Sequence, residues 1–317
     1  MNYTRSDAKS YAKQHLTGIW AAALTPFTSD LRIDEDGFRH NIEHWTQELG
    51  IDGIFVSGKQ GEFYAMTVEE RKRTFDLAVE ATRVSGQTIM SCSDPNMDVV
   101  LDLARYAEQI GADYVVVHAP MLHFAHAQDD TLLAYYTRIA ECVNIGIALW
   151  SHPDSGYLMS PELCNRLADI DNVVAIKYSV PRDMYVELSH LASDRIQVST
   201  ASEVEWLDNI IELDWRLYLC SSPPFLLQTA RDRRMLDYTL AAFDGRHDDA
   251  RAISASLDSV RAALRDTRPA EKPHAHQKYW QELLGQVGGR VRAPLLELTE
   301  DEKARTRAAF EQCGLAK

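Results

Sequence analysis

The 317-residue chain lacks the long apolar segments by which proteins enter or cross membranes. It has no run of 18 or more apolar residues, and residues 1–17 are polar and of mixed charge. A transmembrane helix and a secretory signal both require an apolar stretch. We therefore expect a soluble, cytoplasmic protein that makes no membrane contact.

Paired cysteines and nucleotide-binding signatures are also missing. The five cysteines show no CxxC spacing and are odd in number, which argues against a disulfide framework and against a structural zinc site. No GxGxxG motif follows an apolar run, so a dinucleotide cofactor is not predicted. The net charge of −14 argues against a nucleic-acid surface. We expect neither a metal nor a cofactor.

The chain does contain a regular alternation of short apolar runs and amphipathic segments. The apolar residues of segment 99–110 have helical spacing, and residues 67–70 have the spacing of a capping box at a helix start. Eight runs rich in β-branched residues predict strands at 19–24, 54–56, 88–90, 114–117, 145–149, 173–176, 196–198 and 217–220. Eight strand–helix repeats favour an α/β fold of the closed (β/α)8 TIM-barrel type over a doubly wound sheet.

The pattern also predicts three parts of the chain. Residues 1–17 form an N-terminal segment and residues 18–224 the barrel core. Residues 225–317 contain only helical patterns, interrupted at 268–273, and are predicted to form the last barrel helix and a C-terminal helical extension.

Lys177 follows the apolar run 173–176 and precedes the turn at 178–181. Reactive groups of β/α barrels gather at the C-terminal ends of the strands. A lysine that is buried there loses its proton more readily and can attack a carbonyl carbon to form a Schiff base. On this segment alone, a surface lysine at the start of a loop is the alternative.

Five segments, in order, resemble the dihydrodipicolinate synthase and N-acetylneuraminate lyase family. They are residues 18–27, 58–62, 111–113, 175–177 and 289–295. The resemblance implies a class I carbon–carbon or carbon–oxygen lyase, in which Lys177 forms a Schiff base with pyruvate or another small 2-oxo acid. It also implies a homo-oligomer, either a tetramer or a dimer.

The glycine-rich turn of this family usually reads Gly-Thr-Thr-Gly-Glu and binds the carboxylate of the oxo acid. Here it reads Gly58-Lys59-Gln60-Gly61-Glu62, so the glycines are kept and both hydroxyls are replaced. We expect the first four residues to bind the substrate through backbone N–H groups and the new side chains. Lys59 has three interpretations: it contacts the substrate carboxylate, it favours the unprotonated amine of Lys177, or it pairs with Glu62 or another acid.

The family's proton-shuttle tyrosine is absent after the fifth predicted strand. The family segment reads Tyr-Asn-x-Pro, whereas residues 150–153 read Trp-Ser-His-Pro, and the loop 118–126 lacks the partner tyrosine. An indole donates a hydrogen bond but does not exchange protons near neutral pH. The proton transfers must therefore use other residues.

Histidines are the natural substitutes because they titrate near neutral pH. Four of them follow the fourth and fifth predicted strands: His118, His123, His126 and His152. We expect His152 or His123 to act as the acid or base, and His118 and Trp150 to contact the substrate. A metal site built from these histidines is an alternative, although their spacing matches no standard motif.

The surroundings of the site point away from the synthase reaction itself. The arginine that this branch of the family carries has no counterpart at residues 154–157. Aromatic residues near the site, namely Phe63, Tyr64, Phe124 and Trp150, suit an apolar substrate end. The favoured function is a hydratase-aldolase that releases pyruvate and an aromatic or apolar aldehyde. The alternatives are a dehydratase of a sugar-derived oxo acid, a barrel that only binds oxo acids, and a histidine-dependent metal hydrolase or decarboxylase.

Overall fold

The strands of the protein form one eight-stranded sheet in a computed structural model that describes residues 2–122, 128–219 and 224–315. Its order is β7-β6-β5-β4-β3-β2-β1-β8, and β1 pairs with β8 in parallel. The strands are β1 (Gly18–Ala22), β2 (Gly53–Val56), β3 (Gln87–Ser91), β4 (Tyr114–His118), β5 (Gly146–Ser151), β6 (Val173–Tyr178), β7 (Gln197–Ser199) and β8 (Leu217–Leu219). The predicted (β/α)8 TIM-barrel class is confirmed.

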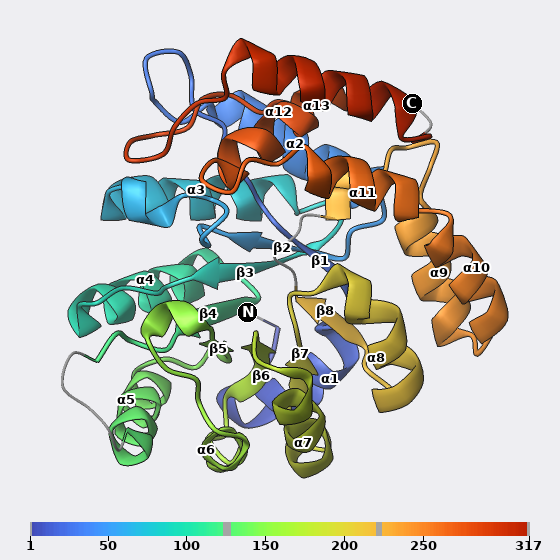
Figure 1. The fold of residues 1–317 in the computed structure, drawn as a ribbon. Helices are drawn as coiled ribbons and strands as arrows, with labels where there is room; N and C mark the ends of the chain where they lie inside the picture. Colours follow the sequence, from blue (N-terminus) through green and yellow to red (C-terminus); the bar gives the residue numbers. More distant parts are fainter. Residues whose placement is uncertain (1, 123–127, 220–223, 316–317) are drawn as a thin grey trace. The chain divides into compact units, whose positions relative to one another are not determined.

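Helices alternate with these strands along the chain, as Figure 1 shows, and the described residues after β8 form helices but no further strand of the sheet. The early helices are α1 (Ala8–His15), α2 (Glu35–Gln47), α3 (Val68–Ala81), α4 (Met97–Ile110), α5 (Asp129–Cys142), α6 (Pro161–Leu167), α7 (Arg182–Ala192) and α8 (Trp206–Leu213). The C-terminal helices are α9 (Arg234–Phe243), α10 (His247–Ala255), α11 (Asp258–Asp266), α12 (Pro273–Leu283) and α13 (Glu300–Gln312). The predicted interruption at 268–273 lies between α11 and α12.

The strands β5 and β6 each end two residues later than the sequence predicted. β5 ends at Ser151 rather than 149, and β6 ends at Tyr178 rather than 176. Trp150 and Lys177 therefore lie inside strands and not in the turns that follow. The prediction ended each strand where its most apolar run ended, but every residue of both strands is buried.

Contacts divide the chain into two compact units. The first contains Met1–Trp20 and Gln87–Cys220, and the second contains Ala21–Gly86 and Ser221–Lys317. The first unit therefore holds β3 to β8 with α4 to α8, and the second holds β2, α2, α3 and α9 to α13. The three-part division drawn from the sequence stays a prediction.

The first unit begins with a helix that the sequence pattern did not indicate. α1 buries only Ala8 and Ala12, so its apolar face is too small to give a clear helical period. Tyr3, ahead of α1, donates its hydroxyl hydrogen to Asp113 O at 2.5 Å and accepts from Gly146 N at 2.8 Å. These bonds attach the N-terminal segment to the start of β4 and of β5.

In the second unit, α2, α3 and α13 begin with side-chain caps. The predicted capping box is confirmed: Thr67 Oγ1 accepts from Glu70 N at 3.2 Å, and Glu70 Oε2 accepts from Thr67 N at 2.9 Å. α2 contacts the turn after α12, because Trp45 Nε1 donates to Gln286 Oε1 at 2.8 Å. The first two turns of α12 are buried on several faces, since each residue from His274 to Gln281 is buried.

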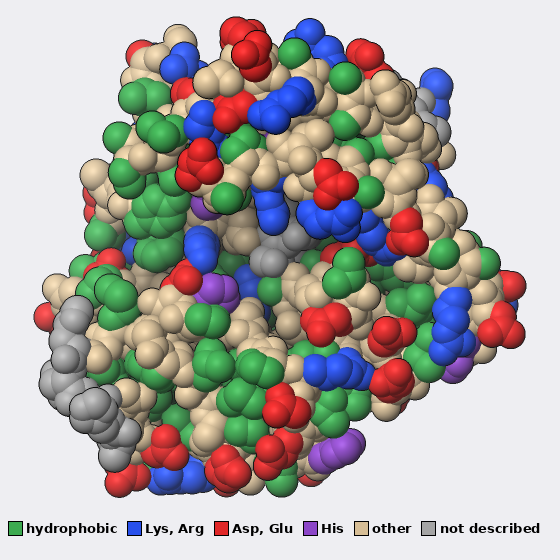
Figure 2. Space-filling model, viewed as in Figure 1, with side chains coloured by type: hydrophobic (Ala, Val, Ile, Leu, Met, Phe, Trp, Pro, Cys, Tyr) green, Lys and Arg blue, Asp and Glu red, His purple; other side chains and the backbone are tan. Residues whose placement is uncertain are grey.

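Acidic and basic side chains are interspersed on the face drawn in Figure 2. Within the described residues, no helix combines the length and the apolarity that a bilayer span requires.

Candidate active site

A row of side chains crosses four neighbouring strands of the first unit at one level. His118 of β4 is paired in register with Trp150 of β5, Trp150 with Lys177 of β6, and Lys177 with Ser199 of β7. Register partners in a parallel sheet point to the same face. The sheet therefore brings His118, Trp150 and Lys177 together near the C-terminal ends of their strands, where catalytic residues of β/α barrels lie.

Lys177 is 1% exposed. Its Nζ lies 4.5 Å from the centre of the Trp150 indole ring, and Trp150 is itself 3% exposed. The indole face attracts the ammonium form and at the same time covers the amine from water. The tryptophan that replaces the expected tyrosine is thus a direct neighbour of the predicted nucleophile.

His118 has a defined tautomer when its ring is neutral. Its Nδ1 lies 2.7 Å from Ala119 O, so Nδ1–H donates to this carbonyl and Nε2 carries the lone pair. Burial is the largest influence and lowers the pKa of His118, while the hydrogen bond to Ala119 O and the charge of Asp154 act in the opposite direction. The ring edge meets Trp150 at a centroid distance of 4.7 Å. This histidine can accept a proton near neutral pH.

The side chain of His152 caps a short helix. Its Nδ1 accepts a hydrogen bond from Asp154 N at 3.1 Å and so caps the short helix η3 (Pro153–Ser155). Its ring centre lies 6.3 Å from that of His118 and 6.4 Å from that of Trp150. Its side chain is 27% exposed.

Of the other predicted residues, His123, His126 and Phe124 lie outside the part of the chain that the structure describes. In the part of the chain that the structure describes, no group of three or more His, Cys, Asp and Glu side chains is placed to hold a metal ion.

Three tyrosines around this row donate hydrogen bonds from their hydroxyls to backbone carbonyls. Tyr136, Tyr157 and Tyr178 donate to Val117 O, Pro120 O and Met159 O, respectively. Burial raises the pKa of all three hydroxyls. They hold the loops around the row and are poorly suited to exchanging protons.

The glycine-rich turn lies in the second unit, after β2. A Cβ on Gly58 would come within 2.3 Å of the Phe55 ring, so this position requires glycine. Ser57 and Glu62, at the two ends of the turn, both have positive φ angles, of 51° and 60°. Gly61 O accepts a hydrogen bond from Thr25 Oγ1 at 2.9 Å. The chain is thus held in a compact loop that leads into η2 (Phe63–Ala65).

Glu62 is fully buried and has partners on both carboxylate oxygens. Oε1 lies 2.6 Å from Lys278 Nζ, and Oε2 accepts from Arg292 N at 2.9 Å. One of the three interpretations of Lys59 is an ion pair with Glu62. In that pair, Lys59 would have to share a carboxylate that Lys278 and Arg292 N already contact. The backbone carbonyl of Lys59 accepts a hydrogen bond from His274 Nε2 at 3.0 Å.

Lys278, His274 and Arg292 were missed as functional candidates. Lys278 and His274 belong to α12, more than 200 positions after the turn, and no motif connects them with it. The one signal in the sequence is a lysine in a helix that also carries Ala275, Tyr279 and Trp280. A buried lysine requires a partner, but the sequence does not say which acid supplies it.

The fold and the buried strand-end lysine define the class of barrel lyases that work through a Schiff base. Residues 15–313 match the model of the Dihydrodipicolinate synthetase family, and the chain belongs to this family of pyruvate-dependent aldolases and lyases. The resemblance seen in the sequence is confirmed.

Individual relatives are distant from this chain. The 4-hydroxy-tetrahydrodipicolinate synthase of Methanothrix thermoacetophila is 25% identical over 293 residues, which cover 92% of this chain and 94% of the relative. The synthase of Clostridium perfringens strain 13 is 31% identical over 188 residues, 59% of this chain and 63% of the relative. A prophage protein of the dihydrodipicolinic acid synthase family from E. coli K12, solved with pyruvate, has a TM-score of 0.83 at 22% identity. That match covers 95% of this chain and 99% of the other.

Proposed function

We propose that this protein is a class I lyase that forms a Schiff base between Lys177 and a pyruvate-type 2-oxo acid. The observation that carries the proposal is the burial of Lys177 in one register row with His118 and Trp150. The amine adds to the keto carbon and water leaves, which gives an iminium. A base takes the proton of the C4 hydroxyl, the C3–C4 bond breaks, and the C4 fragment leaves as an aldehyde while the electron pair of the bond forms the enamine between C2 and C3. Protonation of the enamine at C3 and hydrolysis of the iminium then release pyruvate and the free amine.

His118 is proposed to carry the proton that the tyrosine of relatives would carry. It is held by Ala119 O, it is neutral near neutral pH, and its Nε2 lone pair can take a proton. His152, whose Nδ1 is engaged by Asp154 N, is the second candidate. His123, also proposed from the sequence, stays a prediction.

The turn formed by Gly58, Lys59, Gln60 and Gly61 is proposed to bind the substrate carboxylate. Loops that follow the strands of (β/α)8 barrels carry the binding residues, and this turn follows β2. Backbone N–H groups would supply the hydrogen bonds, and Lys59 a positive charge.

The favoured subtype is a hydratase-aldolase whose second product is an aromatic or apolar aldehyde. Its support is the indole of Trp150 beside Lys177 and the lack of arginine at residues 154–157. A dehydratase acting on a sugar-derived oxo acid is the neighbouring subtype. The working protein is proposed to be a homotetramer or a homodimer.

The test of the chemistry is the exchange of pyruvate methyl protons with solvent deuterium, followed by NMR. An enzyme that forms an enamine must catalyse this exchange, whereas a barrel that only binds pyruvate need not. We expect exchange by the wild type and a loss of at least about 100-fold in Lys177→Met. Lys303→Met, which removes a lysine of α13 paired with Glu300, is the matched control and should exchange normally. A wild type without exchange would contradict the proposal.

A further inference from the structure

We propose that α12 positions the turn of residues 58–62 through Lys278 and His274, which makes these two residues positioning residues for oxo-acid binding. The inference rests on the proposed role of this turn as the carboxylate site. It assigns a task in substrate binding to the C-terminal helical extension.

The turn needs support from outside because its own backbone is strained. Ser57 and Glu62 are not glycines, yet both have left-handed backbone conformations, with φ angles of 51° and 60°. Such conformations bring Cβ close to the following carbonyl and persist only where the surroundings fix them. Ser57 is fixed by the bond between its hydroxyl and that of Thr74, at 2.7 Å. Glu62 is fixed by Lys278 and by the backbone of Arg292.

The ion pair between Glu62 and Lys278 is the one of these restraints that comes from α12. The two side chains are 0% and 1% exposed, and their charged atoms are 2.6 Å apart. Burying an ion pair contributes little net stability but makes each partner indispensable to the other. Lys278 also donates to Arg290 O at 2.5 Å and lies 4.6 Å from the centre of the Phe27 ring. The ammonium group is therefore held at one point, and the Glu62 backbone with it.

His274 supplies a second restraint from the same face of α12. Residues 274 and 278 are four positions apart, so their side chains project from neighbouring turns of the helix. His274 Nε2 donates to the carbonyl of Lys59 at 3.0 Å. Burial lowers the pKa of His274, which keeps the ring neutral. One helix face thus holds the turn at its second residue and at its last.

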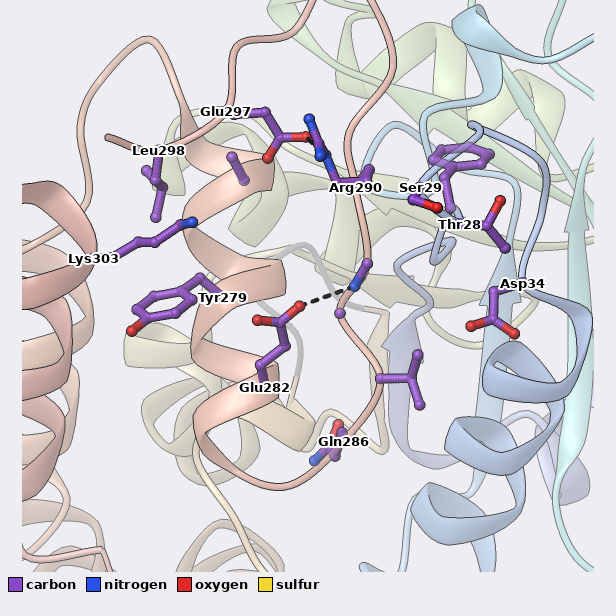
Figure 3. Close-up of a pocket in the computed structure, with 15 residues that line it drawn as sticks. Thr28, Ser29, Asp34, Tyr279, Glu282, Gln286, Arg290, Glu297, Leu298 and Lys303 are labelled. Carbon is purple, nitrogen blue, oxygen red and sulfur yellow. Dashed lines mark hydrogen bonds and ion pairs between the residues drawn. The ribbon is translucent and has the colours of Figure 1, made fainter. Parts of the chain in front are cut away.

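The segment after α12 closes against the same helix, and two glycines permit the contact. A Cβ on Gly288 would lie 2.2 Å from Lys278 O, and a Cβ on Gly289 would lie 2.7 Å from Phe27 O. Gly289 N donates to Glu282 of α12 at 3.2 Å, and Figure 3 shows Glu282 among the residues that line a pocket beside this segment. Here the segment lines a cavity of about 730 Å³. These contacts place Arg290 O and Arg292 N beside Lys278 and Glu62.

The test compares pyruvate binding and turnover in Lys278→Met with a control from the same helix. Lys272→Met is the control because Lys272, at the start of α12, pairs with Glu302 at 2.8 Å and touches no part of the turn in the contacts described above. We expect Lys278→Met to raise KM for pyruvate in the exchange reaction about 10-fold or more while kcat changes far less, the pattern of lost ground-state binding. Lys278→Arg should restore part of the affinity, and Lys272→Met should leave KM unchanged.

Two further variants keep the test decisive if Lys278→Met fails to fold. The double variant Glu62→Gln/Lys278→Met leaves no unpaired buried charge, and His274→Gln removes only a neutral contact; both should raise KM. An unchanged KM in the folded variants, or an equal rise in Lys272→Met, would overturn the inference alone. A wild type that exchanges no protons would overturn the proposed function and the inference with it.

Discussion

Trp150 determines which neighbouring residues can carry out proton transfer. Its indole lies against Lys177 and meets the ring edge of His118. It cannot exchange protons at neutral pH, but it keeps water away from the amine. In the proposed function, the task of a proton-shuttle tyrosine is therefore divided. Trp150 shields the amine, and His118, whose Nε2 carries the lone pair, is proposed to accept the proton.

Replacing His118 by glutamine should slow the exchange of pyruvate methyl protons by about 100- to 10,000-fold, the usual contribution of a general base. His152→Gln removes the neighbouring ring and should have a smaller effect, since its Nδ1 already serves Asp154 N. NMR-detected exchange at saturating pyruvate measures both. Equal losses in the two variants would argue against this assignment.

The pH dependence of the exchange should reflect the lowered pKa of His118. Burial lowers this pKa, so the neutral ring, which is the active form, persists below the ordinary histidine pKa of about 6.5. The rate should therefore hold as the pH falls to 6.5 and decline only at more acidic pH. A decline already between pH 7.5 and 6.5, absent from His118→Gln, would contradict this reasoning.

At the scale of single elements, the segment ahead of α1 is attached to the strand starts of the first unit. Tyr3 bonds to Asp113 O and Gly146 N near the starts of β4 and β5, far along these strands from His118 and Trp150. In β/α barrels this end of the strands serves stability and the opposite end serves chemistry.

Tyr3→Phe should therefore lower the free energy of unfolding without altering the exchange rate. The change leaves one buried N–H and one carbonyl without a partner, at a cost of about 1–3 kcal/mol. Denaturant unfolding measures the first quantity and NMR the second. A variant as stable as the wild type would show that water replaces the hydroxyl at no cost.

Most of the elements could be predicted from the sequence, and the exceptions have physical causes. The strand before Lys177 was predicted because β-branched residues reveal a buried strand, and α3 because Thr67 and Glu70 form a cap. α1 was missed since it buries only two alanines. The row of His118, Trp150 and Lys177 depends on strand order and register, which a family resemblance implies but a single run of residues does not.

The support of the turn by α12 could not be predicted at all. Glu62 and Lys278 are separated by more than 200 positions, and the apolar neighbours of Lys278 suggest its burial without naming its partner. Only the folded structure shows that both are buried and 2.6 Å apart.

At the scale of the whole molecule, buried neutral histidines make stability depend on pH. His276 is fully buried, its Nε2 lies 2.8 Å from Thr267 Oγ1, and burial lowers its pKa to about 4. The unfolded chain, with a pKa near 6.5 at this residue, binds a proton that the folded chain does not. The stability due to His276 is thus fully present above pH 6.5 and is lost as the pH falls toward 4.

His276→Asn should remove this part of the pH dependence. Linkage gives a loss of about 2 kcal/mol between pH 7.5 and pH 5 for the wild type from His276 alone. The free energy of unfolding of His276→Asn should fall by about 2 kcal/mol less than that of the wild type over this pH range, although the variant is less stable at the start. Denaturant midpoints at the two pH values measure the difference. Parallel losses in the two proteins would mean that the pKa of His276 is the same in the folded and the unfolded chain.

The most direct test of the account is to trap the Schiff base. The protein is incubated with pyruvate and borohydride, its intact mass is measured, and the labelled peptide is mapped. The account predicts one reduced pyruvate adduct per chain, located on Lys177 and absent from Lys177→Ala. An adduct on Lys59, or no adduct with pyruvate and other 2-oxo acids, would contradict it.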